Sequence, residues 1–378
     1  MRSARKDAAR RCRASCTAVF AALVTAALAA LAVGPARGAV FPDLYSLTVT
    51  PEAESGDMRA AAIDLAMRRL LTRVTGARDP AADPELAGMI ADASSYVSFD
   101  GMVDRGRFRV EFNSGPIERA LESLGKPVWG PERPLTLLWI AIDTGAGERV
   151  LLSDSGIGTD TFADTAGLAG ASPETVELAE AIREEIAAVA EERGLPIRFP
   201  LLDLEDLTSV TSADIWVPFV DQVVAGSERY GADAILIGRI SANPFGNSVR
   251  WTLVHRGEEA TFGGIDVADG LHWVADRYVQ AYSFVGGART VRLVVRDVAT
   301  LDDYGRVMSY LEGLSALQSI DWDGYDADER LLSLRASARG DLAVLEQMLG
   351  LGRVLRLDAQ SSLADNTLVL TLVGGSRR

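Results

Sequence analysis

The feature that most constrains the fold is residues 230–256, where an apolar run stands between two turn signals. Gly231 ends a helical pattern, and residues 234–240 follow as a strand rich in Ile and Leu. A turn at residues 243–247 leads to a second strand at residues 249–254. Because apolar residues occupy consecutive positions in the first strand, both of its faces need cover. The sequence therefore predicts an antiparallel β-hairpin inside a covered sheet.

A central α/β domain over residues 132–286 is predicted around this hairpin. Strand 135–142 is strongly apolar and fits either this domain or the preceding one, and we assign it to the central domain. Residues 155–172 are rich in Gly, Ala, Ser, Thr and Asp, which is typical of a loop. The remaining expected elements are helices at 173–193, 214–230 and 266–284 and strands at 197–202 and 260–265.

Both ends of the chain show the order β-α-β-β-α-β, which is that of the ferredoxin-like arrangement. Residues 39–131 supply the first five elements, with Asp57 expected to cap the first helix and Gly76 to end it. Residues 287–378 repeat the order without sequence identity to the first end, so the repeat is one of architecture. The predicted fold class is α/β (α+β), with ferredoxin-like units at both ends flanking the central domain.

The first 38 residues have the pattern of a signal peptide. Six basic residues precede an uncharged run, rich in Ala, Leu and Val, at residues 17–33. Ala36-Arg37-Gly38 then supplies small residues where a signal peptidase reads, so we expect cleavage near Gly38 or Ala39 and a periplasmic protein. An uncleaved inner-membrane anchor is the alternative, because the run approaches the length of a short transmembrane helix.

Cleavage would change both the thiol content and the charge of the chain. Cys12 and Cys16 would leave with the leader, so the mature chain would have no disulfide and no cysteine ligand for a metal. The leader holds seven basic residues and one acidic residue, which leaves 31 basic and 52 acidic residues and a net charge of −21. Such a surface repels phosphate backbones, so nucleic acid is a poor candidate partner. No membrane span is expected after cleavage.

An aspartic-protease interpretation is suggested by Asp143-Thr144-Gly145, which follows an apolar strand, and by Asp154-Ser155-Gly156. That chemistry needs two facing carboxylates that share a proton, each on its own lobe or subunit. Asp143 and Asp154 are only eleven positions apart, and so short a segment cannot build two lobes. We therefore interpret Asp143 as the end of a strand before a turn, with a homodimer that uses Asp143 as the alternative.

Two groups of residues could in principle bind metal. His255 and His272 are the only histidines, and their spacing is not typical of a metal site, so structural roles are favoured. An acidic cluster surrounds Gly324, but its glycine does not fall at the sixth position of a calcium loop, and a solvated turn is favoured. The cluster consists of Asp321, Asp323, Asp326, Asp328 and Glu329.

Four tryptophans, Trp129, Trp216, Trp251 and Trp273, are expected in the core or at an interface, although buried Trp can also line a ligand pocket. No phosphate-binding loop and no nucleophile elbow is present. The sequence therefore supplies no catalytic, cofactor-binding or metal-binding residue, and no cofactor is predicted.

Several segments together resemble an uncharacterised secreted family of Gram-negative bacteria, domain-of-unknown-function family 2066. The segments are RRLLTRVTG (68–76), LLWIAID (137–143), GLPIRFPLLDLEDL (194–207), ADIW (213–216), RYGADAILIGRI (229–240) and HWVADRYVQAY (272–282). The resemblance implies an exported envelope protein without an assigned reaction, so it carries over no catalytic residue.

The function expected from the sequence is non-enzymatic binding or envelope assembly, through contacts with an envelope protein or glycan. A periplasmic small-ligand-binding protein with a pocket in the central domain is the alternative, and a hydrolase is the third possibility. An apolar groove with exposed Trp would favour the first function. A deep cavity with convergent Arg side chains would favour the second.

Overall fold

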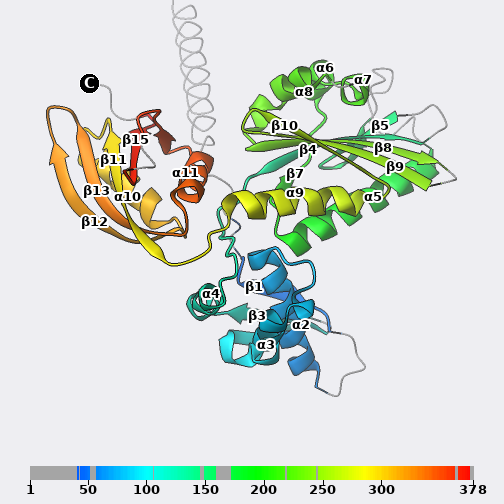
Figure 1. Cartoon of the computed structure of the whole chain (residues 1–378). Coiled ribbons are helices and arrows are strands. Elements are labelled where there is room, and N and C mark those ends of the chain that lie inside the picture. Colours follow the sequence, from blue (N-terminus) through cyan, green and yellow to red (C-terminus); the bar gives the residue numbers. More distant parts are fainter. Residues whose placement is uncertain are drawn as a thin grey trace, which may run out of the picture. The chain divides into compact units, whose positions relative to one another are not determined.

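The computed structural model describes residues 41–374, apart from residues 42, 52–56, 105, 145–148, 159–171, 218, 244–245 and 362–364. The predicted leader and most of the loop expected at 155–172 therefore lie outside the described residues. Helices and strands are mixed along the chain, and the strands form three separate sheets (Figure 1). This confirms the predicted α+β class, while the ferredoxin-like assignment of the two end units stays a prediction.

The first sheet has three antiparallel strands in the order β1-β3-β2. Its core is closed by the long helix α2 together with α4, and α3 and two short 3-10 segments connect α2 to β2. The bounds are β1 (Ser46–Val49), α2 (Met58–Thr75), η1 (Pro80–Ala82), α3 (Pro84–Ala91), η2 (Ala93–Tyr96), β2 (Val97–Asp104), β3 (Arg107–Phe112) and α4 (Ser114–Ser123).

Helix α2 begins and ends where the sequence predicts. The Asp57 carboxylate accepts hydrogen bonds from the backbone N–H groups of Arg59 and Ala60, which would otherwise have no partner. Gly76 ends the helix in the left-handed region, with φ of 77°, a conformation that glycine adopts without a steric penalty. Leu70 and Leu71 are among the fully buried residues of the first core.

The central sheet has the order β10-β9-β8-β4-β5-β6, and the two-residue strand β7 pairs with β4. Strand β4 runs parallel to β8, with Leu138 opposite Leu236. The strand expected at 135–142 thus lies in the central sheet. The bounds are β4 (Thr136–Asp143), β5 (Arg149–Ser153), β6 (Gly156–Gly158), β7 (Ile197–Arg198), β8 (Ala234–Asn243), β9 (Gly246–His255) and β10 (Glu258–Gly264).

Helices cover both faces of the central sheet, as the apolar run in β8 predicts. Leu236 packs on the side of α5 (Pro173–Arg193) and α9 (Val267–Tyr282). Ile235 and Ile237 point to the other side, which is covered by α6 (Leu204–Ser209), α7 (Ser212–Trp216) and α8 (Val220–Ser227) (Figure 1). The hairpin β8–β9 is therefore interior to the sheet and covered on both faces.

Three predicted boundaries in this region were wrong. The single helix expected at 214–230 is instead α7, α8 and the 3-10 segment η3 (Glu228–Tyr230). A proline at position 218 stands between α7 and α8, and a proline has no backbone N–H to continue a helix. The strand expected at 197–202 is limited to β7, and residues 156–158, expected as loop, form β6 against β5.

The third sheet has the order β12-β13-β11-β15-β14, in which β11 and β15 are parallel. Its core-facing residues include Leu293, Leu334 and Leu370, which are fully buried with residues of α10 and α11. The bounds are β11 (Ala288–Arg296), α10 (Leu301–Glu312), β12 (Leu317–Asp326), β13 (Leu331–Arg339), α11 (Leu342–Leu351), β14 (Leu355–Leu357) and β15 (Thr367–Leu372).

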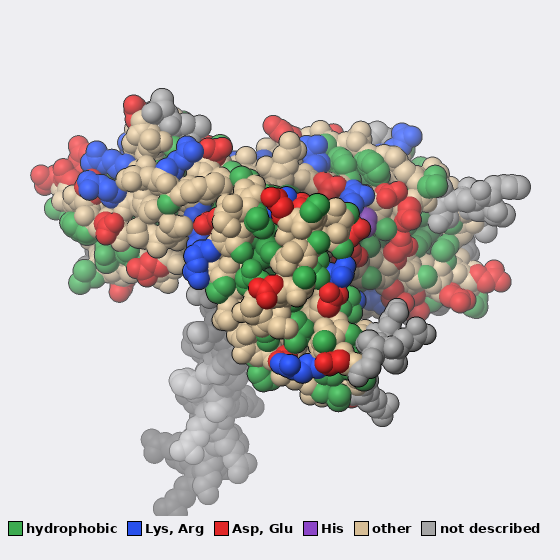
Figure 2. Space-filling model, turned by 60° about the horizontal axis from the view of Figure 1, so that its bottom comes forward, with side chains coloured by type: hydrophobic (Ala, Val, Ile, Leu, Met, Phe, Trp, Pro, Cys, Tyr) green, Lys and Arg blue, Asp and Glu red, His purple; other side chains and the backbone are tan. Residues whose placement is uncertain are grey.

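Among the helices of the described residues, none is both long enough and apolar enough to cross a membrane. Acidic side chains are spread over the face shown in Figure 2, and basic side chains gather at fewer places. The formal net charge of the whole chain is −15.

Candidate functional site

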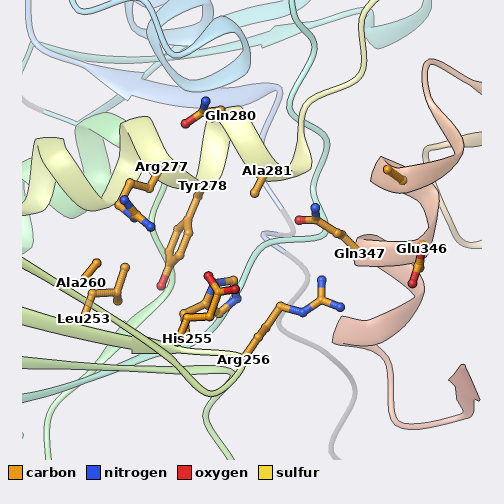
Figure 3. A pocket seen from close by; sticks show the side chains of 12 residues that line it. Leu253, His255, Arg256, Ala260, Arg277, Tyr278, Gln280, Ala281, Glu346 and Gln347 are labelled. Atoms are coloured by element: carbon orange, nitrogen blue, oxygen red, sulfur yellow. The ribbon is translucent and has the colours of Figure 1, made fainter. Parts of the chain in front are cut away.

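A cleft of about 540 Å³ lies at the turn between β9 and β10, beside helix α9 (Figure 3). Leu253, Ala260 and Tyr278 contribute its apolar surface. Residues of α11, among them Glu346 and Gln347, also line it. The cleft thus combines side chains from β9, β10 and α9, which are consecutive in the sequence, with side chains from the distant helix α11.

The turn that borders the cleft has two residues, Arg256 and Gly257, between the paired residues His255 and Glu258. Both turn residues have positive φ, 56° and 78°. A type I′ turn requires this geometry, and Asn-Gly or Gly-Gly adopts it with little strain. Arginine at the first position has a Cβ and is therefore strained in the left-handed region. The two-residue turn places the Arg256 side chain at the edge of the cleft.

His255 lies at the centre of the cleft, at the end of β9. Its Nε2 atom is 2.8 Å from the Tyr282 hydroxyl, and its ring meets the Tyr278 ring edge-to-face at 5.4 Å. Burial first, and then the charges of Arg256 and Arg277, lower the pKa of His255 to about 4. The imidazole is therefore neutral at pH 7.

Arg277 approaches the cleft from α9. Its guanidinium lies over the Trp273 ring, 5.4 Å from the ring centroid, and that ring is stacked on Phe262. Within the described residues, neither Arg256 nor Arg277 forms a salt bridge. Glu258 and Glu346 also line the cleft, so the two guanidinium groups have carboxylates in the same cleft but no direct ion pair.

Two tyrosines of α9 lie beside His255: Tyr278 lines the cleft, and Tyr282 is buried behind it. The Tyr278 hydroxyl is 2.8 Å from Oγ1 of Thr136, which is the first residue of β4. Burial raises the pKa of Tyr278, and it raises that of Tyr282 to about 12. Both phenols therefore stay protonated at neutral pH and act as hydrogen-bonding groups rather than as bases.

This arrangement suits the binding of an oxyanion. Two guanidinium groups can donate several hydrogen bonds to a carboxylate or phosphate, often in bidentate geometry. A neutral imidazole and a phenol can add neutral hydrogen bonds. A nucleophile with an adjacent base is not part of this set, since the residues that line the cleft include no Ser, Thr or Cys.

A second cavity of similar volume lies beside α8, on the opposite face of the central sheet. Its lining is acidic and partly apolar: Asp214, Phe219, Val220, Asp221, Gln222 and Glu259. Asp214 closes a capping box with Thr211, which already explains its position at the start of α7. The cleft at the β9–β10 turn is the more specific arrangement, because two guanidinium groups and a neutral histidine line it together.

The aspartates of the protease interpretation occupy different local settings. Asp143 ends β4, and its Oδ2 atom lies 3.3 Å from Nε of Arg149 on β5. Asp154 lies in the turn between β5 and β6, where its backbone N–H donates to the Pro200 carbonyl. Arg149 thus supplies Asp143 with a positive partner on the neighbouring strand.

The other residues considered as metal ligands form hydrogen bonds or ion pairs with groups of the protein. His272 is on α9, with Nδ1 3.2 Å from a guanidinium nitrogen of Arg193. In the acidic cluster, Asp323 pairs with Arg335, and Asp326 accepts backbone hydrogen bonds in the turn that follows β12. Across the described part of the chain, no group of three or more His, Cys, Asp or Glu side chains could hold a metal ion.

The four tryptophans divide between core and surface roles. Trp251 is fully buried and lies against Gly238 and Gly270, where an added Cβ would come within 2.5 Å of its ring. Trp129 is buried beneath the guanidinium of Arg133 at 3.8 Å. Trp216 and Trp273 each carry an arginine over the ring, and Trp273 is the one that holds Arg277 at the cleft.

A buried group of arginines, which the sequence did not suggest, joins the ends of two helices. Arg133 is 0% exposed and donates to the carbonyls of Arg73, at the end of α2, and of Arg193 and Gly194, at the end of α5. These carbonyls have no partner within their helices, and the helix dipole favours a cation there. The role of this group is structural, because each of the three side-chain nitrogens of Arg133 already donates a hydrogen bond to a backbone carbonyl.

Sequence reasoning missed Arg256 and Arg277 as well. The signal for Arg256 is its position: in HRGEE an arginine-glycine pair separates two predicted strands, where a two-residue hairpin turn places both residues at positive φ. No comparable signal exists for Arg277, because only the packing of α9 against the sheet brings it to the same cleft.

Comparisons with known proteins give little on function. A family model described as a domain of unknown function (DUF8605) matches residues 39–130, a family with a number different from the one that the motifs resemble. No curated protein matches the chain. Among solved structures, the C-terminal domain of LpoB from Salmonella enterica is similar, with 12% identity and a TM-score of 0.19, over 35% of this chain and 83% of that chain. A TM-score this low supports no conclusion about the fold or the function of this chain. The family that residues 39–130 resemble has no assigned function.

Proposed function

We propose that this chain is an exported, non-enzymatic binding protein of the bacterial envelope, whose ligand presents an oxyanion to the cleft at the β9–β10 turn. The observation that carries the proposal is Arg256, a charged residue held at positive φ where Asn or Gly would be less strained. Local strain of this kind is stored at functional sites. Arg277 supplies a second guanidinium beside the same neutral histidine.

The cleft favours the small-ligand alternative over an extended protein contact. Its volume of about 540 Å³ lies within the usual range for small-molecule sites. Arg256 and Arg277 both line it, and arginine side chains in a cavity are the feature expected for that alternative. A carboxylate or phosphate group of an envelope glycan or of a small metabolite would have the required chemistry.

Export to the periplasm is supported by the basic segment, the apolar run and Ala36-Arg37-Gly38, and the resemblance to family 2066 points the same way. The organisation into residues 39–131, 132–286 and 287–378 belongs to the same proposal. Mass measurement of the protein from a periplasmic extract tests the first part, with a chain that starts near Ala39 as the expected result.

Binding is tested by thermal unfolding with inorganic phosphate or acetate, at constant ionic strength with chloride as the reference. Either anion should raise Tm if it fills the cleft. Arg256→Asn and Arg277→Gln should remove the increase, whereas Arg119→Gln, the same loss of charge on the exposed surface of α4, should keep it.

Arg256→Asn also separates binding from folding. Asn relieves the left-handed strain, so the variant should be as stable as the parent or more stable by about 1 kcal/mol. An anion response that survives both arginine substitutions, or that is lost equally in Arg119→Gln, would contradict the assignment of the ligand to this cleft.

A further inference from the structure

A second surface, at the edge of the third sheet, carries side chains that the cleft does not use. Strand β12 is ten residues long and is the edge strand next to β13. An edge strand presents N–H and C=O groups that no neighbouring strand satisfies, and proteins usually cover or protect them. Two bulges, at Leu317–Ser319 and Trp322–Gly324, interrupt the pairing of β12, so the regular stretch is short.

The core-facing side of β12 is left open. Directly opposite residues of an antiparallel pair lie on one face, and Trp322 is opposite Leu334 and Tyr325 opposite Leu332. The two leucines are at most 1% exposed, but Trp322 is 59% and Tyr325 43% exposed. The core of the sheet therefore continues to its edge as an uncovered aromatic surface.

Helix α10 extends this surface. The Tyr304 ring meets the Trp322 ring edge-to-face, with 6.0 Å between centroids. Leu301, at the start of α10, is 87% exposed. The Tyr325 hydroxyl donates to the Val298 carbonyl just before α10, which fixes its ring beside that end of the helix. We call Leu301, Tyr304, Trp322 and Tyr325 the aromatic strip.

The turns at this end of the strip are acidic. The β11–α10 connection and the β12–β13 turn meet there, with the Val298 N–H donating to the Arg330 carbonyl at 3.1 Å. Arg330 is the basic residue of these turns. The acidic residues, none of which forms a salt bridge within the described part of the chain, are Asp297, Asp302, Asp326, Asp328 and Glu329.

We infer that the aromatic strip and these carboxylates form a docking surface for a basic, extended segment of a partner protein. Lys or Arg side chains are attracted both to an exposed Trp face and to unpaired carboxylates. Apolar side chains of the same segment would cover Trp322 and Tyr325, and the regular part of β12 offers backbone hydrogen bonds to an extended chain.

A second copy of the same chain fits this surface poorly. A second copy would bring the same acidic excess, a formal net charge of −15 for the whole chain, and like charges oppose association. The opposite face of β12 offers less to a basic segment, because Arg335 and Arg292 already pair with Asp323 there. Charge complementarity therefore selects a basic partner on the strip side.

The test uses the purified protein and a fluorescein-labelled peptide of alternating Val and Arg, with a peptide of alternating Val and Glu as its counterpart. Fluorescence anisotropy should show binding of the Arg peptide that weakens as salt rises, and no binding of the Glu peptide. Trp322→Ala should weaken binding about tenfold, and Asp302→Asn with Asp328→Asn should lower its salt dependence.

The matched control is Phe99→Ala, which removes an aromatic residue of similar exposure, 53%, from β2, the edge strand of the first sheet. It should leave binding unchanged. Equal binding of both peptides, equal loss in Phe99→Ala, or unchanged binding in Trp322→Ala would overturn the inference. A dimer in solution that Trp322→Ala dissociates, or a neutral oligosaccharide bound at Trp322 in place of the Arg peptide, would overturn the choice of partner.

Discussion

At the scale of the single residue, Arg133 shows how one buried cation can serve two helix ends. Its guanidinium donates to five carbonyl oxygens and lies on the Trp129 ring, without a carboxylate among its hydrogen-bond partners. Burial lowers its pKa to about 9, which still leaves it charged at neutral pH. The charge is tolerated because helix C-termini supply partial negative charge in place of an acid.

Arg133→Lys should therefore destabilise the protein although the charge is kept. An ammonium has three donors in a compact head and cannot reproduce a planar fork that reaches five carbonyls. We expect a loss of about 2–4 kcal/mol in the free energy of unfolding, measured by urea denaturation. Arg119→Lys, on the exposed surface of α4, should be neutral, and equal stability of the two variants would show that the fork geometry is unimportant.

The lowered pKa of His255 predicts how the free energy of unfolding depends on pH. Its folded pKa of about 4 lies below the ordinary histidine value of 6.5, so between these values the unfolded chain binds more protons than the folded chain. The contribution of neutral His255 is thus complete above pH 6.5 and is lost as the pH falls toward 4. His255→Gln should flatten this slope in denaturation midpoints measured at pH 7, 5.5 and 4.5.

His272 has a pKa shifted in the same direction, by burial first and then by Arg193 and Arg78, so it contributes to the same slope. His272→Gln is the matched variant, and each histidine should account for part of the pH dependence. A slope unchanged in both variants would mean that other groups control acid stability.

At the scale of the element, the packing of α9 on the central sheet depends on a contact between one glycine and one tryptophan. Gly270 lies so close to Trp251 that an added Cβ would be 2.0 Å from Nε1 of the indole. This close approach brings α9 down onto β9 and so places Arg277 and Tyr278 beside His255. The positions of Arg277 and Tyr278 in the cleft therefore depend on how closely α9 packs on the central sheet.

In Gly270→Ala, helix propensity and core packing should change the free energy of unfolding in opposite directions. Propensity alone predicts a gain of about 1 kcal/mol for Gly→Ala inside a helix, whereas overpacking of a core costs about 1–3 kcal/mol. We expect a net loss, because Trp251 is fully buried and its ring could shift only by disturbing a close-packed core. Gly88→Ala in α3, where nothing lies within 4 Å of the new Cβ, should instead be neutral or stabilising in the same denaturation assay.

At the scale of the whole molecule, acidic excess is the dominant electrostatic feature. The chain has 53 acidic and 38 basic residues, and most of its ion pairs involve exposed side chains, which contribute little each. Repulsion between unpaired carboxylates opposes the compact state and is screened by salt. Stability should therefore rise with ionic strength.

Raising KCl from about 0.02 M to about 0.3 M should increase Tm, with most of the increase complete once the Debye length falls below about 10 Å. The variant Arg256→Asn with Arg277→Gln should show the same increase, because general screening does not depend on the cleft. If that variant lost the effect, chloride bound at the cleft, rather than screening, would be its cause.

The sequence by itself determined the elements whose causes lie within a few residues. Asp57 and Gly76 mark the ends of α2, Ser172 and Gly194 those of α5, and the apolar run of β8 required cover on both faces. Capping, glycine conformation and side-chain alternation are local effects, so they can be predicted without the fold.

Only the tertiary structure decided the parallel pairing of β4 with β8, the role of Arg133 and the composition of the cleft. Arg133 is 60 residues from Arg73 in sequence, and Arg256 is 90 residues from Glu346. A local pattern cannot report which distant carbonyl or side chain a guanidinium will meet, because that depends on how buried helices and strands pack together. The candidate site thus arises from packing between elements, while each element arises from its own short stretch of sequence.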